Sequence, residues 1–182
     1  LRAFVNGVSH GFHFNEGAST LTQQLLKNNV FTNWTNEGKI ERFKRKIQEQ
    51  YLALQLEASL TAEGMDTKRV ILENYLNTIN LSAINLGQNT LGVESASLRY
   101  FGKHCSDLTI SECAVIASIT QNPSKNNPIR HPEENAKRRK KVLTNMRNQG
   151  YISEAEYQEA LADNVYERIQ ETDSSQETAT PY

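Results

Sequence analysis

Apolar residues recur along most of this chain at spacings of three and four, the period that places side chains on one face of an α-helix. No run of residues alternates between apolar and polar as a half-buried strand would. The pattern therefore predicts a mainly α-helical protein. The expected helices span residues 1–8, 19–29, 38–61, 66–79, 89–100, 109–120, 133–149 and 153–163.

Several helix starts carry a cap that can be recognised in the sequence. In a capping box, a hydroxyl and a carboxylate or amide three residues later each accept a hydrogen bond from the backbone N–H of the other residue. Asp66 can cap the segment TKRVILENYL, and Gly102 and Gly150 are expected to end helices. The three boxes are Thr20-x-x-Gln23, Thr109-x-x-Glu112 and Ser153-x-x-Glu156.

The helix at 19–29 has an unusual polar side. Leu21 and Leu25 are expected to point into a core, while amides and one lysine fall four residues apart on another side. An ordinary surface helix would carry Glu and Lys, so we interpret this side as one that offers hydrogen bonds to a ligand. Its members are Gln23, Gln24, Lys27 and Asn28.

The helix at 38–61 carries two different stripes. Phe43, Ile47 and Leu54 form an apolar stripe. A charged stripe with the spacing i, i+3, i+4 and i+7 runs roughly opposite to it. A solvated face with weak ion pairs is the simplest interpretation of that pattern. The charged residues are Arg42, Arg45, Lys46 and Glu49.

A second interpretation of the charged stripe follows if the two helices pack side by side. Lys27 would then join Arg45 and Lys46 in a cationic cleft that contains Glu49. Such cations suit a phosphate or pyrophosphate leaving group, because they offset charge that develops in the transition state. No G-x-x-x-x-G-K-[ST] loop is present, so the sequence gives no sign of a P-loop nucleotide site.

Composition adds few constraints. The chain has 182 residues, enough for one domain with a core, and a net charge of −1 that does not favour nucleic acid. Two basic runs, 39–46 and 137–141, stand out locally. The two cysteines and four histidines show no metal-ligand spacing, so we expect free thiols that are at least half-buried. Residues 169–182 have almost no apolar content and are expected to form a linker.

Four blocks of the sequence, in order, resemble the peptidoglycan glycosyltransferase module of class A penicillin-binding proteins, glycosyltransferase family 51. The resemblance covers roughly residues 1–163. It implies a mainly α, lysozyme-like, two-lobed helical domain with a donor cleft between the lobes. The blocks are GASTLTQQLLKN at 17–28, RKIQEQYLALQLE at 45–57, ILENYLN with LGVESASLRYFGK at 71–103, and DLTISECAVIASITQNPSKNNP at 107–128.

This resemblance also implies a reaction. The family polymerises lipid II into β-1,4 glycan strands with inversion and releases undecaprenyl pyrophosphate. By position, Lys27 and Lys46 match lysines that contact the pyrophosphate, and Glu49 matches the second acidic residue of the cleft, which is not the general base. The remaining residues expected to bind substrate are Ser19, Thr20, Gln23, Gln24, Asn28, Arg42 and Arg45.

The sequence departs from the family pattern in two places. The general base of the family lies in an E-D-x-x-F-x-x-H-x-G block that has no counterpart here, so we expect the chain by itself to be catalytically inactive. We accordingly interpret 1–168 as a glycosyltransferase domain without its first segment, and 169–182 as a polar linker toward a transpeptidase domain. Glu41 stands where the family commonly has an arginine, and Arg42 or Lys39 is the candidate substitute.

The resemblance further implies the surroundings of the protein. The expected partners are lipid II, the growing glycan strand, a membrane surface, moenomycin-type inhibitors and the transpeptidase domain, with no nucleic acid. The expected location is the outer face of a bacterial cell membrane, anchored by a transmembrane helix outside this chain. No organic cofactor is implied, although Mg²⁺ or Mn²⁺ can accompany the pyrophosphate.

Two alternative functions remain open from the sequence. A lytic transglycosylase or muramidase would share the fold and need one acidic residue, but it would not require the cations Lys27, Arg45 and Lys46. A non-catalytic helical module could instead bind nucleic acid through 39–46 and 137–141, with affinity that falls as salt rises. Cleavage of intact sacculi would identify the first alternative, and a salt-dependent DNA shift the second.

Overall fold

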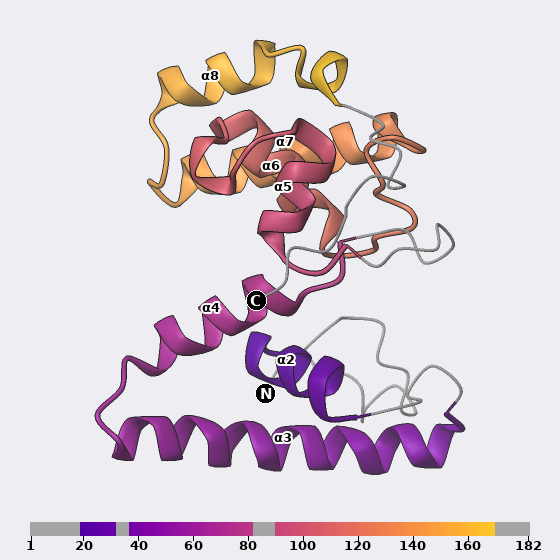
Figure 1. Cartoon of the computed structure of the whole chain (residues 1–182), viewed down its shortest axis with the longest axis vertical. Coiled ribbons are helices and arrows are strands. Elements are labelled where there is room, and N and C mark those ends of the chain that lie inside the picture. Colours follow the sequence, from indigo (N-terminus) through magenta and orange to yellow (C-terminus); the bar gives the residue numbers. More distant parts are fainter. Residues whose placement is uncertain (1–18, 32–36, 82–89, 170–182) are drawn as a thin grey trace, which may run out of the picture. The chain divides into compact units, whose positions relative to one another are not determined.

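The computed structural model of the protein describes residues 19–31, 37–81 and 90–169. The chain divides into two compact units, Leu1–Thr78 and Ile79–Tyr182, each of which is described by itself (Figure 1). Within the described residues the secondary structure is helical apart from one isolated antiparallel bridge, Asn80 to Leu91. The predicted mainly α fold class is therefore confirmed.

The first unit consists of three described helices, α2 (Leu21–Val30), α3 (Lys39–Ala62) and α4 (Thr67–Thr78). The short α2 packs against both of the others. Its most buried side chain is Thr22, whose Oγ1 donates to Glu57 Oε1 on α3 at 2.6 Å. From α4, Ile71 and Tyr75 are buried. These contacts hold the polar side of α2 close to α3.

The second unit is built around α6, where seven of ten residues are buried. Helices α7 and α8 pack on α6 and on each other, and their core includes Ala114, Leu143 and Tyr157. Tyr100 and Phe101 of α5 are also buried. The elements are α5 (Val93–Phe101), η2 (Cys105–Asp107), α6 (Ile110–Ile119), α7 (Pro132–Asn148), α8 (Glu154–Ala162) and η3 (Val165–Arg168).

The predicted caps are confirmed. All three capping boxes form, with the Thr20, Thr109 and Ser153 hydroxyls each accepting from the N–H three residues later. Asp66 Oδ1 accepts from the Arg69 N–H at 3.2 Å at the start of α4. Gly102 ends α5 with a φ of 67°, a backbone angle that glycine adopts without strain.

The prediction for 89–100 was wrong at its start, since α5 begins at Val93. Two backbone bonds explain the difference. The Leu81 N–H donates to Thr90 O at 2.9 Å, and the Gly92 N–H donates to Ile79 O at 2.8 Å. Gly92 then turns the chain into the helix with a φ of 82°. The helix predicted at 1–8 lies outside the described residues.

Both cysteines were expected to be at least half-buried, and this was wrong. Cys105 and Cys113 are free thiols, as expected, but both are exposed. Cys105 lies in η2, and Cys113 lies in the first turn of α6. The helical period could not assign them to a face because residues around them, such as His104 and Ser106, are themselves exposed.

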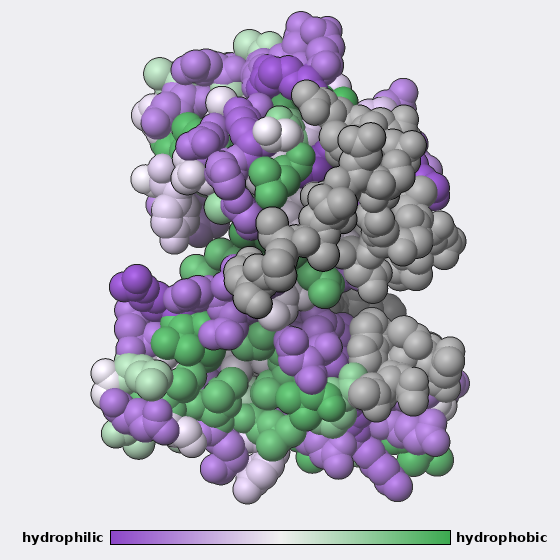
Figure 2. All heavy atoms as spheres, in the orientation of Figure 1, coloured by the Kyte–Doolittle hydropathy of each residue, from purple (hydrophilic) through white to green (hydrophobic). Residues whose placement is uncertain are grey.

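The apolar stripe of α3 lies on the outside of the described unit. Phe43, Ile47 and Leu54 are 45%, 56% and 61% exposed, whereas Arg45 and Glu49 of the charged stripe are 7% and 0% exposed. Leu21 of α2, expected in a core, is also exposed. Figure 2 shows apolar side chains gathered on the surface of this unit. Helix α3 therefore buries Arg45 and Glu49, while Phe43, Ile47 and Leu54 stay largely exposed within the described residues.

The Glu112 carboxylate of α6 bonds to three parts of the second unit: the segment after α5, the N-cap residue of α6 and η3. Its buried carboxylate accepts from Lys103 Nζ at 2.7 Å, from the Thr109 N–H at 2.8 Å and from Arg168 Nε at 3.2 Å. Burial raises the pKa of this carboxyl, but the bonds from Lys103 and Thr109 outweigh burial and lower it overall from 4.5. The folded unit thus favours the ionised form of Glu112.

This arrangement predicts acid sensitivity of the second unit. A carboxyl whose folded pKa lies below its unfolded value of about 4.5 stabilises the fold above that pH, and the contribution is lost as pH falls through the folded pKa. We expect Glu112→Gln to flatten the acid dependence of amide hydrogen exchange in α6. Glu133→Gln, which replaces an exposed carboxylate on α7, is the control. Equal flattening by both variants would contradict this role of Glu112.

Candidate functional site

The candidate site lies in the first unit, where the start of α2 meets α3. Lys46 Nζ of α3 donates to Ser19 Oγ, just before α2, at 2.8 Å and to Glu49 Oε2 at 2.7 Å. The α2 capping box fixes the backbone that carries Ser19, because Thr20 is its N-cap residue. The side chain of Lys46 thus links α3 to Ser19, which lies 27 residues earlier in the sequence.

Glu49 is fully buried and faces two cations. Its Oε2 accepts from Lys46, and its Oε1 accepts from Arg45 Nη1, one helical turn earlier. Since each carboxylate oxygen is held by a cation, Glu49 is placed to orient these two side chains. A buried carboxylate without such partners would be costly.

Arg45 is held from its other side by Glu37. Its Nε lies 2.7 Å and 2.8 Å from the two Glu37 oxygens. Burial lowers the pKa of Arg45, but the bonds to Glu37 and Glu49 outweigh burial and raise it. The guanidinium is therefore a fixed positive charge whose direction is set by two carboxylates. Sequence analysis missed Glu37, because it precedes α3 and no helical spacing links it to Arg45.

Lys27 of α2 belongs to the same group. Burial lowers its pKa first, the neighbouring Lys46 lowers it further, Glu49 opposes this, and Arg45 lowers it again. These influences place the Lys27 ammonium within the electrostatic range of all three residues. Helix α2 packs on α3, and the half-buried Lys27 lies near enough to Lys46 and Glu49 for their charges to shift its pKa, which is consistent with the second interpretation of the stripe.

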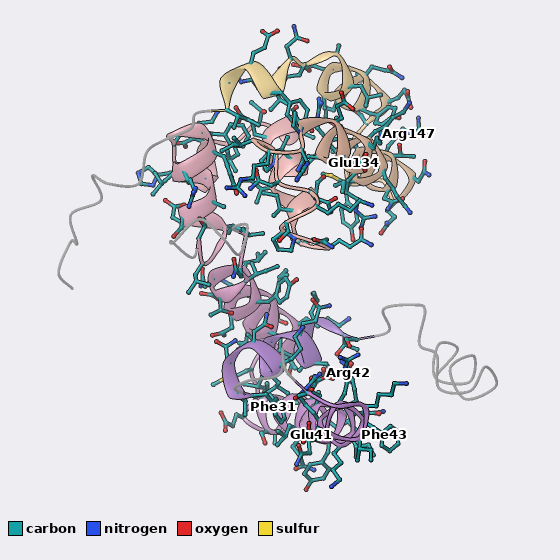
Figure 3. All side chains as sticks on the ribbon, turned by 90° about the vertical axis from the view of Figure 1, so that its right-hand side faces the viewer. Phe31, Glu41, Arg42, Phe43, Glu134 and Arg147 are labelled. Carbon is teal, nitrogen blue, oxygen red and sulfur yellow. The ribbon has the colours of Figure 1, made fainter. Side chains whose placement is uncertain are left out.

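The other predicted site residues are placed differently. Thr20 and Gln23 bond to each other's backbone N–H in the capping box, at 2.9 and 3.2 Å. Gln24 Oε1 accepts from the Tyr75 hydroxyl of α4 at 3.4 Å, so it joins α2 to α4. Asn28 and Arg42 are exposed. Figure 3 labels Arg42 between Glu41 and Phe43 on α3.

Glu41 has a structural role in this chain. Its Oε2 accepts from the Gly38 N–H at 2.8 Å and so caps the start of α3. In this structure Glu41 therefore acts on the helix end, where a carboxylate also suits the positive end of the helix dipole. Among the described residues, Arg42 forms no ion pair with Glu41 or with Glu37, whose partner is Arg45.

The arrangement offers anion binding more than proton transfer. Lys27 is half-buried and Lys46 keeps 45% of its side chain exposed, so both ammonium groups lie near a surface that a ligand can reach. Glu49 has no exposed surface, and its oxygens are occupied by cations. Within the described ranges, no three His, Cys, Asp or Glu side chains form a group that could hold a metal ion.

None of the helices in the described residues has the length and apolar character that a membrane span requires. Along α3 the exposed apolar residues Phe43, Ile47 and Leu54 stand beside exposed charged residues such as Arg42 and Lys44. This side of α3 is therefore an amphipathic surface.

Comparison with known proteins gives a consistent picture. The transglycosylase family matches residues 1–147. The chain is 43% identical over 171 residues to penicillin-binding protein 1A of Clostridium acetobutylicum, covering 90% of this chain and 20% of that protein. It is 40% identical over 146 residues to penicillin-binding protein 1A of Aquifex aeolicus, covering 80% and 18%.

Among solved structures, penicillin-binding protein 1A from Haemophilus influenzae is similar, with 40% identity and a TM-score of 0.49 over 59% of this chain and 15% of that one. The chain spans about a fifth of the length of the curated relatives it matches. The family match covers most of the chain and includes both helices of the candidate site. This protein therefore belongs to the transglycosylase family.

Proposed function

We propose that the first unit binds the pyrophosphate of a lipid-linked sugar, lipid II, as part of a peptidoglycan glycosyltransferase. This enzyme would polymerise lipid II into β-1,4 glycan strands and release undecaprenyl pyrophosphate during cell-wall synthesis. The observation that carries the proposal is the pair of cations Arg45 and Lys46 fixed by the buried Glu49, with the half-buried Lys27 on α2, which packs on the same helix. Family membership and similarity to penicillin-binding proteins support the same activity.

The chemistry of the site suits a pyrophosphate leaving group. Charge builds on the leaving oxygen as the glycosidic carbon is transferred, and preorganised cations stabilise that charge without having to reorient. Glu37 and Glu49 hold Arg45, and Glu49 with Ser19 holds Lys46, so the cations are oriented before a ligand arrives. Glu49 acts here as a positioning residue, because both of its oxygens accept from cations.

A divalent ion has no protein ligand set in this group. Both oxygens of Glu49 and both oxygens of Glu37 accept from Arg45 or Lys46. Mg²⁺ or Mn²⁺ at this site would therefore take its ligands from the pyrophosphate oxygens and water.

The proposal includes partners beyond the donor. Ile40, Phe43 and Ile47 are exposed along α3, and Lys39 and Lys44 flank them. An apolar face with basic neighbours favours contact with an anionic membrane surface, which fits a lipid-linked donor on the outer face of a cell membrane. The growing glycan strand, a transpeptidase domain in a longer parent protein and moenomycin-type inhibitors complete the proposed set.

The test is binding of lipid II by the 182-residue chain in detergent micelles. We expect saturable binding of lipid II and much weaker binding of the same disaccharide-peptide without lipid and pyrophosphate, because the cations of the site recognise the pyrophosphate. Undecaprenyl phosphate, which keeps the lipid but has one phosphate, separates lipid from pyrophosphate recognition. Equal binding of all three compounds would contradict the proposal.

The same material discriminates between the alternative enzymes. A lytic transglycosylase or muramidase would cleave intact sacculi and would not need Lys27 and Lys46. Release of soluble muropeptides from sacculi, with no preference for lipid II, would replace the proposed function by glycan cleavage. The nucleic-acid alternative is disfavoured because Arg45 and Lys46 of the 39–46 run are engaged by Glu37 and Glu49.

A further inference from the structure

A second cationic site lies in the second unit, away from the residues of the proposed donor site in sequence. A surface pocket of about 430 Å³ is formed where the segment after α6 meets the first half of α7. Figure 3 labels Glu134 on this part of α7. The residues that line the pocket are Gln121, Asn122, Lys125, Asn126, Glu134, Lys137, Arg138 and Lys141.

The α7 side of the pocket is one helical stripe. Glu134, Lys137, Arg138 and Lys141 have the spacing i, i+3, i+4 and i+7, so their side chains share a face. Lys137 Nζ donates to Glu134 Oε1 at 2.6 Å, which neutralises one cation. Within the described residues, Arg138, Lys141 and Lys125 form no ion pair. The pocket therefore keeps an excess of about three positive charges at neutral pH.

The opposite side of the pocket is held in place by its own bonds. Asn122 Oδ1 accepts from the Lys125 N–H at 3.0 Å. The buried Asn126 donates through Nδ2 to Ser118 O at 3.0 Å, and its own carbonyl accepts from Asn135 Nδ2 at 2.8 Å. The segment that presents Lys125 is thus anchored to α6 and α7 before any ligand binds, which reduces the ordering cost of binding.

Arg138 has a donor that the protein does not satisfy. Its Nε is buried and has no hydrogen-bond partner in the part of the chain that the structure describes. A buried donor without an acceptor is costly, and most such groups in folded proteins are paired. The Nε of the adjacent Arg139 is likewise buried without a partner, but Arg139 Nη2 donates to the carbonyls of Ala160 and Asp163 next to α8. The guanidinium of Arg139 thus bonds to the fold, whereas that of Arg138 lines the pocket and makes no hydrogen bond or ion pair with the described residues.

We propose that this pocket binds a phosphate group. Arginine matches the oxygens of a phosphate in paired hydrogen bonds, and lysines add point charges around it. A phosphate presents several acceptor oxygens and up to two negative charges, which fits an excess of three cations better than a single carboxylate does. The group can belong to a soluble phosphate ester or to the headgroup of an anionic lipid. The site goes beyond the proposed donor site, since it uses none of its residues.

The experiment is a titration of the 182-residue chain with inorganic phosphate, followed by NMR of the backbone amides of 121–126 and α7. We expect saturable shifts at these amides, and roughly tenfold weaker binding for Arg138→Gln. Lys140→Gln is the matched control, because Lys140 is an exposed cation of the same run that does not line the pocket. Lys141→Gln, at an exposed position, tests the pocket if Arg138→Gln does not fold.

The source of the phosphate is separated in a second arm. Vesicles of phosphatidylcholine with and without phosphatidylglycerol are mixed with the chain and its variants. If Arg138→Gln weakens binding to the anionic vesicles and Lys140→Gln does not, the phosphate belongs to a lipid headgroup. If the two variants bind these vesicles equally, the phosphate belongs to a soluble compound.

Three results would overturn the proposal. They are the absence of saturable phosphate shifts, equal weakening of phosphate binding by Arg138→Gln and Lys140→Gln, and acetate binding as tightly as phosphate at the same ionic strength. None of these results depends on lipid II binding by the first unit.

Discussion

Glu49→Gln is expected to lower the free energy of unfolding of the first unit by about 3 kcal/mol. Breaking a buried ion pair by removing one partner typically costs about 3–5 kcal/mol, because the other charge stays buried without compensation. Glu49 has no exposed surface, and Arg45 is 7% exposed. We expect a cost at the lower end of this range for two reasons. Arg45 keeps its hydrogen bonds to Glu37, and the partly exposed ammonium of Lys46 can turn to water.

The measurement is amide hydrogen exchange in α2 and α3, which reports the stability of this unit separately from the second. Glu73→Gln is the control, since Glu73 is exposed on α4. Arg45→Gln should cost less in the Glu49→Gln background than in the wild-type chain, with a coupling energy of about 1 kcal/mol or more. A loss below about 0.5 kcal/mol for Glu49→Gln would show that the buried pair does not hold α3 in place.

Helix positions were the most predictable feature of this protein. Capping boxes are local, so two residues three positions apart suffice to fix the start of α2, α6 and α8 within one or two positions. The start of α5 was less predictable, because it depends on backbone bonds from 79–81 to 90–92 across an intervening segment. Such non-local pairing leaves no periodic signal in a single sequence.

Helical period could group residues on a face but could not say which face is buried. For α3 it correctly placed Arg45, Lys46 and Glu49 together, yet the simplest interpretation put charges outside and Phe43 and Ile47 inside. The structure buries Arg45 and Glu49 and exposes Phe43 and Ile47, while Arg42 and Lys46 are exposed as that interpretation expects. Charges can be buried at this position because they neutralise one another through Glu37 and Glu49, so their burial depends on a partner that helix spacing cannot find.

The prediction from residue type alone also assigned too many polar groups of α2 to ligand binding. Thr20 and Gln23 were predicted both as a cap and as substrate-binding residues, and the structure uses their bonds for the cap. The Gln24 amide donates to the Ser19 carbonyl and accepts from the Tyr75 hydroxyl, so it too is engaged within the protein. Lys27 and Lys46 are the lysines of the predicted set, and both keep part of their side chain exposed at the site. This exposure makes the lysines the sharpest test of the proposed function.

Lys46→Met is expected to weaken lipid II binding about 10- to 100-fold, the value of one or two charge-assisted hydrogen bonds. Some stability should be lost as well, because the buried Glu49 Oε2 loses its cation while Arg45 still bonds Oε1, so hydrogen exchange in α3 is measured alongside binding. Lys44→Met is the matched control, as Lys44 is an exposed lysine of the same helix outside the charged stripe. Equal loss in both variants would mean that general charge, not the site, attracts the ligand.

A pH profile separates a direct electrostatic role of Lys46 from a structural one. Burial and Lys46 lower the pKa of Lys27 from 10.5, so in the wild-type chain lipid II binding should weaken with rising pH before an ordinary lysine would lose its proton. Removing Lys46 removes the second of these causes, and the pKa of Lys27 should therefore rise. Lys46→Met is thus expected to move the alkaline midpoint of the remaining binding to higher pH, while Lys44→Met leaves it unchanged. An unmoved midpoint in Lys46→Met would show that the two ammonium groups do not share one site, and the pyrophosphate would then have to be held elsewhere.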